Sequence, residues 1–197
     1  MTYEILLGLL AFAFVTSITP GPNNLMLITS GANFGFVRTI PHMLGISLGH
    51  AFMVFLVGVG IGQLFRIWPV LDTAMKVISV AYMLWLAWKF AHAAAPGAAA
   101  AKARPMNFLE AAAFQWVNPK AWAMALGATA AYAPDETPLA YALVALVFCA
   151  TNLPSVSVWA LMGQELRRVL TNPRRLNVFN WTMAGLLVLS LVPVIWH

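Results

Sequence analysis

Six apolar segments, each about as long as a membrane-spanning helix, dominate this chain of 197 residues. They cover residues 5–28, 40–64, 72–90, 108–132, 138–160 and 177–196. A helix needs about 20 mainly apolar residues to cross the hydrocarbon core of a bilayer, where the backbone must satisfy its own hydrogen bonds. The sequence therefore predicts an all-α integral membrane protein with six transmembrane helices.

The composition supports this class and leaves no room for a separate soluble domain. Hydrophobic residues make up 61% of the chain, charged residues only 9%, and the mean hydropathy is +0.80. Soluble domains carry about 25% charged residues. The net charge of +5 does not indicate nucleic-acid binding, because the basic residues lie beside apolar segments and form no basic helix face. We expect one transmembrane transporter domain over residues 1–197.

Basic residues gather beside three of the five connections between the apolar segments. Short cytoplasmic loops carry an excess of lysine and arginine, and this bias sets the orientation of a membrane protein. The other two connections and the amino terminus hold few basic residues and contain Glu4, Asp135 and Glu136. We therefore expect both termini on the periplasmic side of a bacterial inner membrane. The basic residues of the first, third and fifth connections are Arg38, Lys89, Lys102, Arg104, Arg167, Arg168, Arg174 and Arg175.

The third connection, residues 91–106, reads AHAAAPGAAAAKARPM. It is rich in alanine and is broken by Pro96, Gly97 and Pro105, a composition typical of a linker. We expect it to join two halves of the domain, about 1–96 and 104–197.

Two proline-containing breaks lie at matching places in these halves. The first apolar segment is interrupted by TPGPNN, residues 19–24, and the fourth contains QWVNPKAWAMALG. Pro119 follows Pro22 by 97 positions (119 − 22 = 97). Each half would hold three helices, and because three is odd the second half would be inverted relative to the first. The breaks thus predict two inverted three-helix repeats with broken first and fourth helices.

Each break has the sequence of a helix start. Thr19 or Gly21 before Pro22, and Asn118 before Pro119, fit a cap residue followed by proline at the first helical position. The free N–H groups and positive dipole end of such a half-helix bind anions, including the carboxylate of a substrate. The predicted substrate-binding residues are Thr19, Pro20, Gly21, Pro22, Asn23, Asn24, Gln115, Asn118, Pro119, Lys120 and Asn152.

Lys120 is a charge near the middle of a predicted span, and such residues face a cavity or an acidic partner. In the first turn of the helix beginning at Pro119, its ammonium would add to the dipole and attract a carboxylate. A structural ion pair is the alternative. Asn23 and Asn24 could bind an amino or carboxyl group, or could serve as caps and interhelical hydrogen-bonding groups.

His50 lies well inside the second apolar segment. Because the ordinary pKa of histidine lies near neutrality, it is our candidate for carrying a coupling proton. A neutral hydrogen-bonding role is the alternative. Two pairs of glycines in the same segment, Gly45 with Gly49 and Gly58 with Gly62, allow close helix packing, within one subunit or between subunits of a homo-oligomer.

Three stretches resemble successive signatures of the LysE/RhtB family of bacterial amino-acid exporters. They read TPGPNNLMLITSGANFGFVRTIPHMLGISLGH, AYMLWLAWKFA and FQWVNPKAWA, and the resemblance covers essentially the whole chain. The details are most similar to the branch that exports cysteine and O-acetylserine. The resemblance implies proton-driven efflux of neutral amino acids or their derivatives, of cysteine/O-acetylserine, homoserine/threonine or leucine type. In relatives that export basic amino acids an acid stands near the place of His50, which favours a neutral substrate here.

Two other classes of function fit the sequence less well than secondary transport. A divalent-metal exporter of similar architecture would need several ligands converging in the membrane, and this chain has only 6 acidic residues, 4 histidines and 1 cysteine. An intramembrane enzyme would need a nucleophile with a base or a metal motif, and neither is present. We therefore expect no enzyme activity, no cofactor and no metal. The expected partners are an amino acid, protons and the lipid bilayer, and not nucleic acid.

Overall fold

The computed structural model describes residues 1–92, 104–166, 168–170 and 172–192, and every regular element among them is a helix. This confirms the predicted all-α class. The π-helical turn Val57–Ile61 and the 3₁₀ turn Gln115–Val117 lie between longer helices. The α-helices are α1 (Tyr3–Ile18), α2 (Pro22–Phe34), α3 (Phe36–Leu56), α4 (Gly62–Ile67), α5 (Pro69–Ala91), α6 (Phe108–Phe114), α7 (Pro119–Tyr132), α8 (Pro138–Leu166) and α9 (Pro173–Leu189).

Both predicted breaks are confirmed as helix starts. Helix α2 begins at Pro22 and α7 begins at Pro119, each with proline in the first turn. Proline fits there because the first N–H groups of a helix have no partner inside it. Helices α1 and α2 meet at an angle of 54°, so the first apolar segment is a bent pair of helices.

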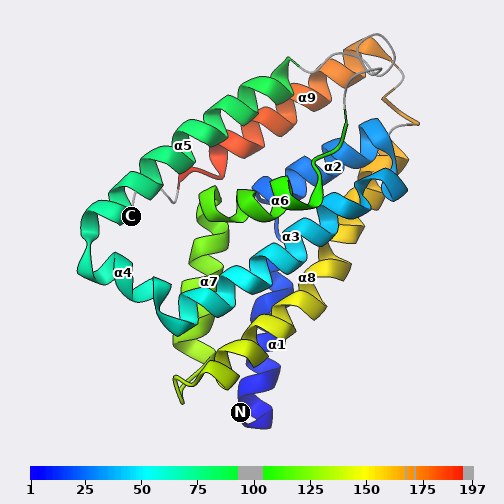
Figure 1. The fold of residues 1–197 in the computed structure, drawn as a ribbon. Coiled ribbons are helices and arrows are strands. Elements are labelled where there is room, and N and C mark those ends of the chain that lie inside the picture. Colours follow the sequence, from blue (N-terminus) through cyan, green and yellow to red (C-terminus); the bar gives the residue numbers. More distant parts are fainter. Residues whose placement is uncertain (93–103, 167, 171, 193–197) are drawn as a thin grey trace.

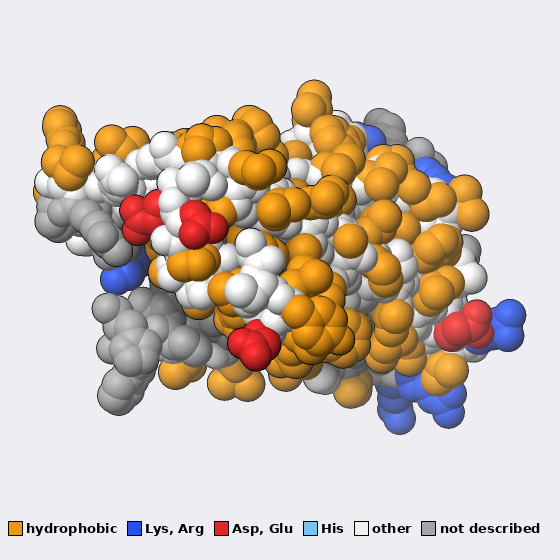
Figure 2. Space-filling view, turned by 90° about the horizontal axis from the view of Figure 1, so that it is seen from below, with side chains coloured by type: hydrophobic (Ala, Val, Ile, Leu, Met, Phe, Trp, Pro, Cys, Tyr) orange, Lys and Arg blue, Asp and Glu red, His pale blue; other side chains and the backbone are white. Residues whose placement is uncertain are grey.

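Among the described residues, two helical segments, Phe36–Leu64 and Pro138–Leu166, are long and apolar enough to cross a membrane. The bent pair α1–α2 makes a third if it is counted as one span. The other three predicted spans coincide with α5, with α6 followed by α7, and with α9. These helices do not meet the same criteria of length and hydropathy. Hydrophobic side chains cover most of the face in Figure 2, and basic side chains lie toward its edges. Such an exterior suits a bilayer.

The most extensive helix packing joins the two predicted halves. Helix α8 packs along α1, α2 and α3, while α6 packs on α3 and α5 packs on α9 (Figure 1). The halves are thus interleaved, since α1 and α2 lie mainly against α8 and α6 lies mainly against α3. Most of the predicted linker, residues 93–103, lies outside the described residues.

Glycines allow the closest helix contacts. A Cβ added to Gly31 of α2 would lie 2.1 Å from the carbonyl oxygen of Ala160, and one added to Gly163 of α8 would lie 2.1 Å from that of Ile28. The predicted pair Gly45 and Gly49 packs α3 on α6 within the chain. Close backbone approach is the usual role of small residues between membrane helices.

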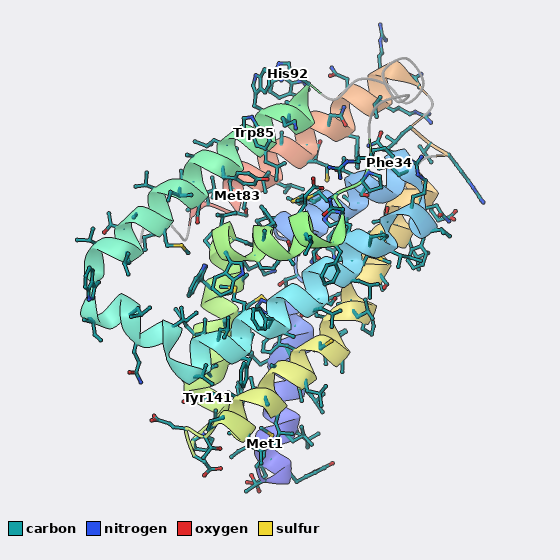
Figure 3. All side chains as sticks on the ribbon, viewed as in Figure 1. Met1, Phe34, Met83, Trp85, His92 and Tyr141 are labelled. Carbon is teal, nitrogen blue, oxygen red and sulfur yellow. The ribbon has the colours of Figure 1, made fainter. Side chains whose placement is uncertain are left out.

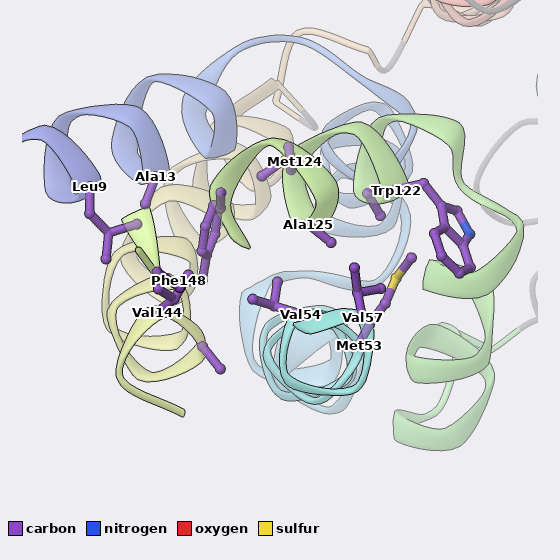
Figure 4. Close-up of a cluster of buried hydrophobic side chains, with 14 of the residues drawn as sticks. Leu9, Ala13, Met53, Val54, Val57, Trp122, Met124, Ala125, Val144 and Phe148 are labelled. Atoms are coloured by element: carbon purple, nitrogen blue, oxygen red, sulfur yellow. The ribbon is translucent and has the colours of Figure 1, made fainter. Parts of the chain in front are cut away.

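The largest hydrophobic cluster fills the space between α1, α3, α7 and α8 (Figure 4). Leu9 and Ala13 of α1 meet Val144 and Phe148 of α8 there, and the cluster continues to α3 and α7. This cluster packs α1 and α7, one helix from each break, against α3 and α8.

Candidate functional site

The first break brings the carboxyl end of α1 beside the amino end of α2. Residues Thr19, Pro20 and Gly21 are extended or non-helical between the two helices. Asn24, in the first turn of α2, folds back so that its Nδ2 donates to the carbonyl oxygens of Ser17 and Thr19, at 2.8 Å each. The side chain of Asn24 thus caps the carboxyl end of α1, which was one of the alternatives raised from the sequence.

Gly21 is the cap residue of α2, and that helix end has no side-chain cap hydrogen bond. The early N–H groups of α2, including those of Asn23 and Asn24, lie where a helix has no partners of its own. Both residues line the cavity at the break. This end of α2 can therefore accept an anion.

The second break is capped differently. Asn118 is the cap of α7, and its side-chain oxygen accepts from the backbone N–H of Lys120 at 3.2 Å. One N–H group at the amino end of α7 is thus already bound by a side chain, whereas no side chain caps the amino end of α2.

The ammonium of Lys120 crosses from the second break to the first. Its Nζ donates to the carbonyl oxygen of Thr19 at 2.8 Å, to Oγ1 of Thr19 at 2.9 Å and to the carbonyl oxygen of Pro20 at 3.3 Å. A Cβ at Gly21 would lie 2.7 Å from Cδ of Lys120, so the lysine side chain would have to shift if another residue stood there. A cation at a helix carboxyl end is favourable because the dipole is negative there.

A second tie joins the breaks through two amides. Nδ2 of Asn23 donates to Oε1 of Gln115 at 2.8 Å, and Nε2 of Gln115 donates to Oδ1 of Asn23 at 3.2 Å. Gln115 is fully buried. This reciprocal pair holds the start of α2 against the 3₁₀ turn before α7.

Asn152 of α8 links three helices below the break. Its Nδ2 donates to Oγ of Ser17 on α1 at 3.1 Å, and its Oδ1 accepts from Oγ of Ser47 on α3 at 2.9 Å. Sequence reasoning missed both serines, because a lone serine in an apolar helix gives no signal until its partner is known.

The two breaks enclose a small polar cavity. Its volume is about 20 Å³, room for roughly one water molecule. Its lining includes seven of the predicted residues. These are Gly21, Asn23, Asn24, His50, Asn118, Lys120 and Asn152, joined by Thr16, Ser17, Ala121, Met124 and Val156. Of the other predicted residues, Thr19, Pro20 and Gln115 bond to this group, and Pro22 and Pro119 begin the two helices.

His50 lies in this lining with 2% of its surface exposed. Neither ring nitrogen has a hydrogen-bond partner in the described part of the chain, and the ring meets Phe148 edge-on at 5.2 Å between centroids. Buried nitrogens without a hydrogen-bond partner are rare in proteins, so each needs a physical explanation. His42, two turns earlier on α3, is equally buried with both nitrogens unpaired. His42 was not predicted from the sequence, because it lies near the edge of the apolar segment.

No group of three or more histidine, cysteine or acidic side chains within the described ranges could hold a metal ion. The cavity instead offers amide, hydroxyl and carbonyl groups, one ammonium and one imidazole. Such groups suit a small polar molecule that carries both a positive and a negative charge.

The comparisons with known proteins point in the same direction. The family described as LysE type translocator matches residues 14–192. The chain is 29% identical to the cysteine/O-acetylserine efflux protein of Salmonella typhimurium and 28% identical to that of Escherichia coli (strain K12), over 100% of each chain. It is 27% identical to the protein of the same name from Klebsiella pneumoniae, over 99% of each chain. No solved structure matches the chain.

Proposed function

This chain belongs to the LysE family of translocators, and we propose that it exports neutral amino acids or their close derivatives across the bacterial inner membrane. The observation that carries the proposal is the first break, where the carbonyl end of α1 and the uncapped amino end of α2 meet in one polar cavity. A neutral amino acid is a zwitterion with two charges one carbon apart. The paired helix ends offer complementary partial charges at similarly close range.

In this proposal the carboxylate binds at the amino end of α2, beside Asn23 and Asn24. The substrate ammonium binds the carbonyl oxygens of Thr19 and Pro20, to which Lys120 donates in this structure. Lys120 thus occupies the place of the ammonium until the substrate displaces it. Its charge, once released, would lie close enough to pair with the carboxylate.

The size of the cavity requires that the site open before it can load. About 20 Å³ cannot hold an amino acid, so the ties Lys120–Thr19 and Asn23–Gln115 have to separate. Both ties join the two breaks, and each lies between segments that alternating access would move in an inverted-repeat transporter. The ammonium of the substrate would donate to the carbonyl oxygens that Lys120 leaves, which would offset the loss of the hydrogen bonds from Lys120 to Thr19 and Pro20.

Export of a divalent metal is disfavoured by the same geometry. The ammonium of Lys120 would repel a metal ion in the cavity, and the polar groups beside it include no carboxylate. The family is one of translocators, so we infer transport rather than catalysis.

We further propose that His50 carries the coupling proton. It lines the cavity, it is buried, and neither ring nitrogen is engaged with a described residue. A proton on His50 would place a second positive charge beside the site of the substrate ammonium. Proton and substrate would then occupy the cavity in alternation, which is the requirement for antiport.

The direct test is uptake into inverted membrane vesicles, with a panel of neutral, basic and acidic amino acids and a divalent metal outside. We expect uptake of small neutral amino acids that increases when a proton gradient, acidic inside, is imposed. Uptake of the metal with no uptake of any amino acid would overturn the proposal.

Lys120→Met tests the site within the same assay. The variant cannot pair with the substrate carboxylate as the released ammonium of Lys120 would, so transport per folded protein should fall by about 10-fold or more. Arg175→Met, which removes an exposed cation at the start of α9, should leave the rate unchanged. A normal rate and affinity for Lys120→Met at normal abundance would contradict the role of Lys120.

His50→Gln separates coupling from binding. Glutamine retains hydrogen-bonding groups but cannot carry the proton. We expect exchange of labelled for unlabelled amino acid to persist in this variant, while uptake driven by the proton gradient is lost. Equal stimulation by the gradient in both proteins would contradict a coupling role for His50.

A further inference from the structure

A groove much larger than the polar cavity lies between α5 and α6. Its volume is about 600 Å³, and none of its lining residues belongs to the cavity at the breaks. Helix α5 contributes one wall and α6 the other, with the segment before α6 between them. The lining residues are Tyr82, Trp85, Leu86, Lys89, Arg104, Pro105, Met106, Glu110, Ala113, Phe114 and Val117.

The walls of the groove are apolar and aromatic. Leu86 and Phe114 are buried at its sides, and the ring of Tyr82 lies 5.5 Å from that of Phe114 and 5.3 Å from that of Trp85. Ala113 is exposed and leaves space on the α6 side. A groove of this kind beside membrane helices suits a hydrocarbon chain.

The charged groups of the groove lie at the end of α5 and at the start of α6, which form its charged end. Nζ of Lys89 lies 4.4 Å above the ring of Trp85. Arg104 forms a two-point ion pair with Glu110, through hydrogen bonds of 2.7 and 2.5 Å. The charges of Arg104 and Glu110 cancel, so the net positive charge at this end comes from Lys89. No carboxylate of the described residues pairs with Lys89.

The position of this end fits the surface of a bilayer. Trp85 and Trp88 are 48% and 60% exposed near the end of α5, where Figure 3 shows Trp85 followed by His92. Exposed tryptophans are typical of the membrane–water interface, and lysines near helix ends extend toward the headgroups. We therefore expect the ammonium of Lys89 to lie at headgroup depth, with the apolar walls of the groove below it.

We propose that this groove is a binding site for an anionic phospholipid. The phosphate pairs with the ammonium of Lys89, and an acyl chain lies along Leu86, Ala113 and Phe114. Basic pockets between transmembrane helices are suited to acidic lipid headgroups. A free phosphate would use only the lysine, whereas a lipid fills the apolar walls as well. Bound lipid would also connect α5 to α6.

The test uses the full chain in nanodiscs of phosphatidylcholine with and without phosphatidylglycerol, and native mass spectrometry of protein extracted in mild detergent. We expect phosphatidylglycerol to remain bound to the natural protein and to raise its melting temperature. Lys89→Gln should weaken retention by about fivefold, the scale of one lysine at an anionic surface, and Lys89→Arg should restore it. Arg175→Gln, which removes an exposed cation elsewhere, should have no effect.

A second pair of variants tests the apolar wall without changing charge. Ala113→Trp should fill the groove and release the lipid, whereas Ala123→Trp, on an exposed position of α7 outside the groove, should not. Inorganic phosphate should not compete with the lipid. Unchanged phosphatidylglycerol binding in both Lys89→Gln and Ala113→Trp would overturn the proposal, as would equal binding of phosphatidylcholine. Lipid retention and the melting temperature are both measured without amino-acid transport, so this test does not depend on the proposed export function.

Discussion

Lys120 illustrates how the role of a single residue depends on its partners. Its place in the first turn of α7 suggested that it adds charge to an anion site at that helix end. The structure instead directs its ammonium to the carbonyl end of α1, and Asn118 caps α7. The uncapped end belongs to α2. The proposed carboxylate site therefore moves from Pro119 to Pro22, and Lys120 becomes the group that the substrate ammonium replaces.

The amide pair of Asn23 and Gln115 leads to a prediction at the residue scale. Asn23→Ala and Gln115→Ala should each lower the free energy of unfolding by about 1–3 kcal/mol, because each leaves a partly or fully buried amide without its partner. The double variant should lose less than the sum of the two single losses. Unfolding in mixed micelles with increasing denaturing detergent measures these differences.

A matched control uses Asn107, which caps the start of α6 and lies outside the cavity. Asn107→Ala should lower stability by about 1 kcal/mol through loss of the cap. Combined with Asn23→Ala, its effect should be additive. Additive losses for Asn23 and Gln115 would show that the reciprocal hydrogen bonds contribute nothing as a pair.

Glycine contacts decide how the elements pack. Gly31 and Gly163 let the backbones of α2 and α8 approach each other, and Gly45 and Gly49 do the same for α3 and α6. Each contact joins one predicted half to the other. The local sequence indicated the second pair, because its glycines share one helix face. The first pair is separated by 132 positions (163 − 31 = 132) and has no local signal.

Substitution of Gly163 tests the contact between α2 and α8. In Gly163→Ala the new methyl group would lie 2.1 Å from the carbonyl oxygen of Ile28, so the helices have to separate. We expect a loss of about 1–3 kcal/mol in stability, typical of overpacking, and a lower yield of folded protein. Thermal unfolding in detergent provides the measurement.

Gly185 in α9 is the matched control, since nothing lies within 4 Å of a Cβ added there. Gly185→Ala should leave the melting temperature unchanged or raise it, because alanine favours helices by about 1 kcal/mol over glycine. If both alanine variants behaved alike, the close approach of α2 and α8 would not hold.

Charge distribution is a property of the whole molecule, and it predicts the orientation in the membrane. The turn between α2 and α3, the ends of α5 and α8 and the start of α9 lie toward the upper right of Figure 1. These are the places that carry Arg38, Lys89, Arg168 and Arg174. The start of α1 and the turn between α7 and α8, with its acidic residues, lie at the bottom.

We predict that both termini face the periplasm, because the basic ends should face the cytoplasm. A reporter enzyme active only outside the cytoplasm, fused after His197, should therefore be active. The same reporter inserted directly after Arg104 should be inactive. The opposite pair of results would refute this orientation.

The sequence by itself determined the class of the molecule and the position of its breaks. Hydropathy and the geometry of proline are local properties, so the apolar segments and the helix starts at Pro22 and Pro119 could be read directly. The family could be recognised for the same reason, since its signatures are contiguous stretches of the chain. Most of the site residues predicted from the sequence line the cavity or form hydrogen bonds with residues that line it.

Only the tertiary structure decided which groups face each other. Three connections show this: the bonds from Lys120 to Thr19 and Pro20, the amide pair of Asn23 and Gln115, and the bridge from Asn152 to Ser17 and Ser47. The residues that they join lie 92 to 135 positions apart in the sequence. Hydrogen bonds form only within about 3.5 Å and depend on direction. Whether two distant groups meet at that range depends on how whole helices pack, which no local pattern of residues specifies.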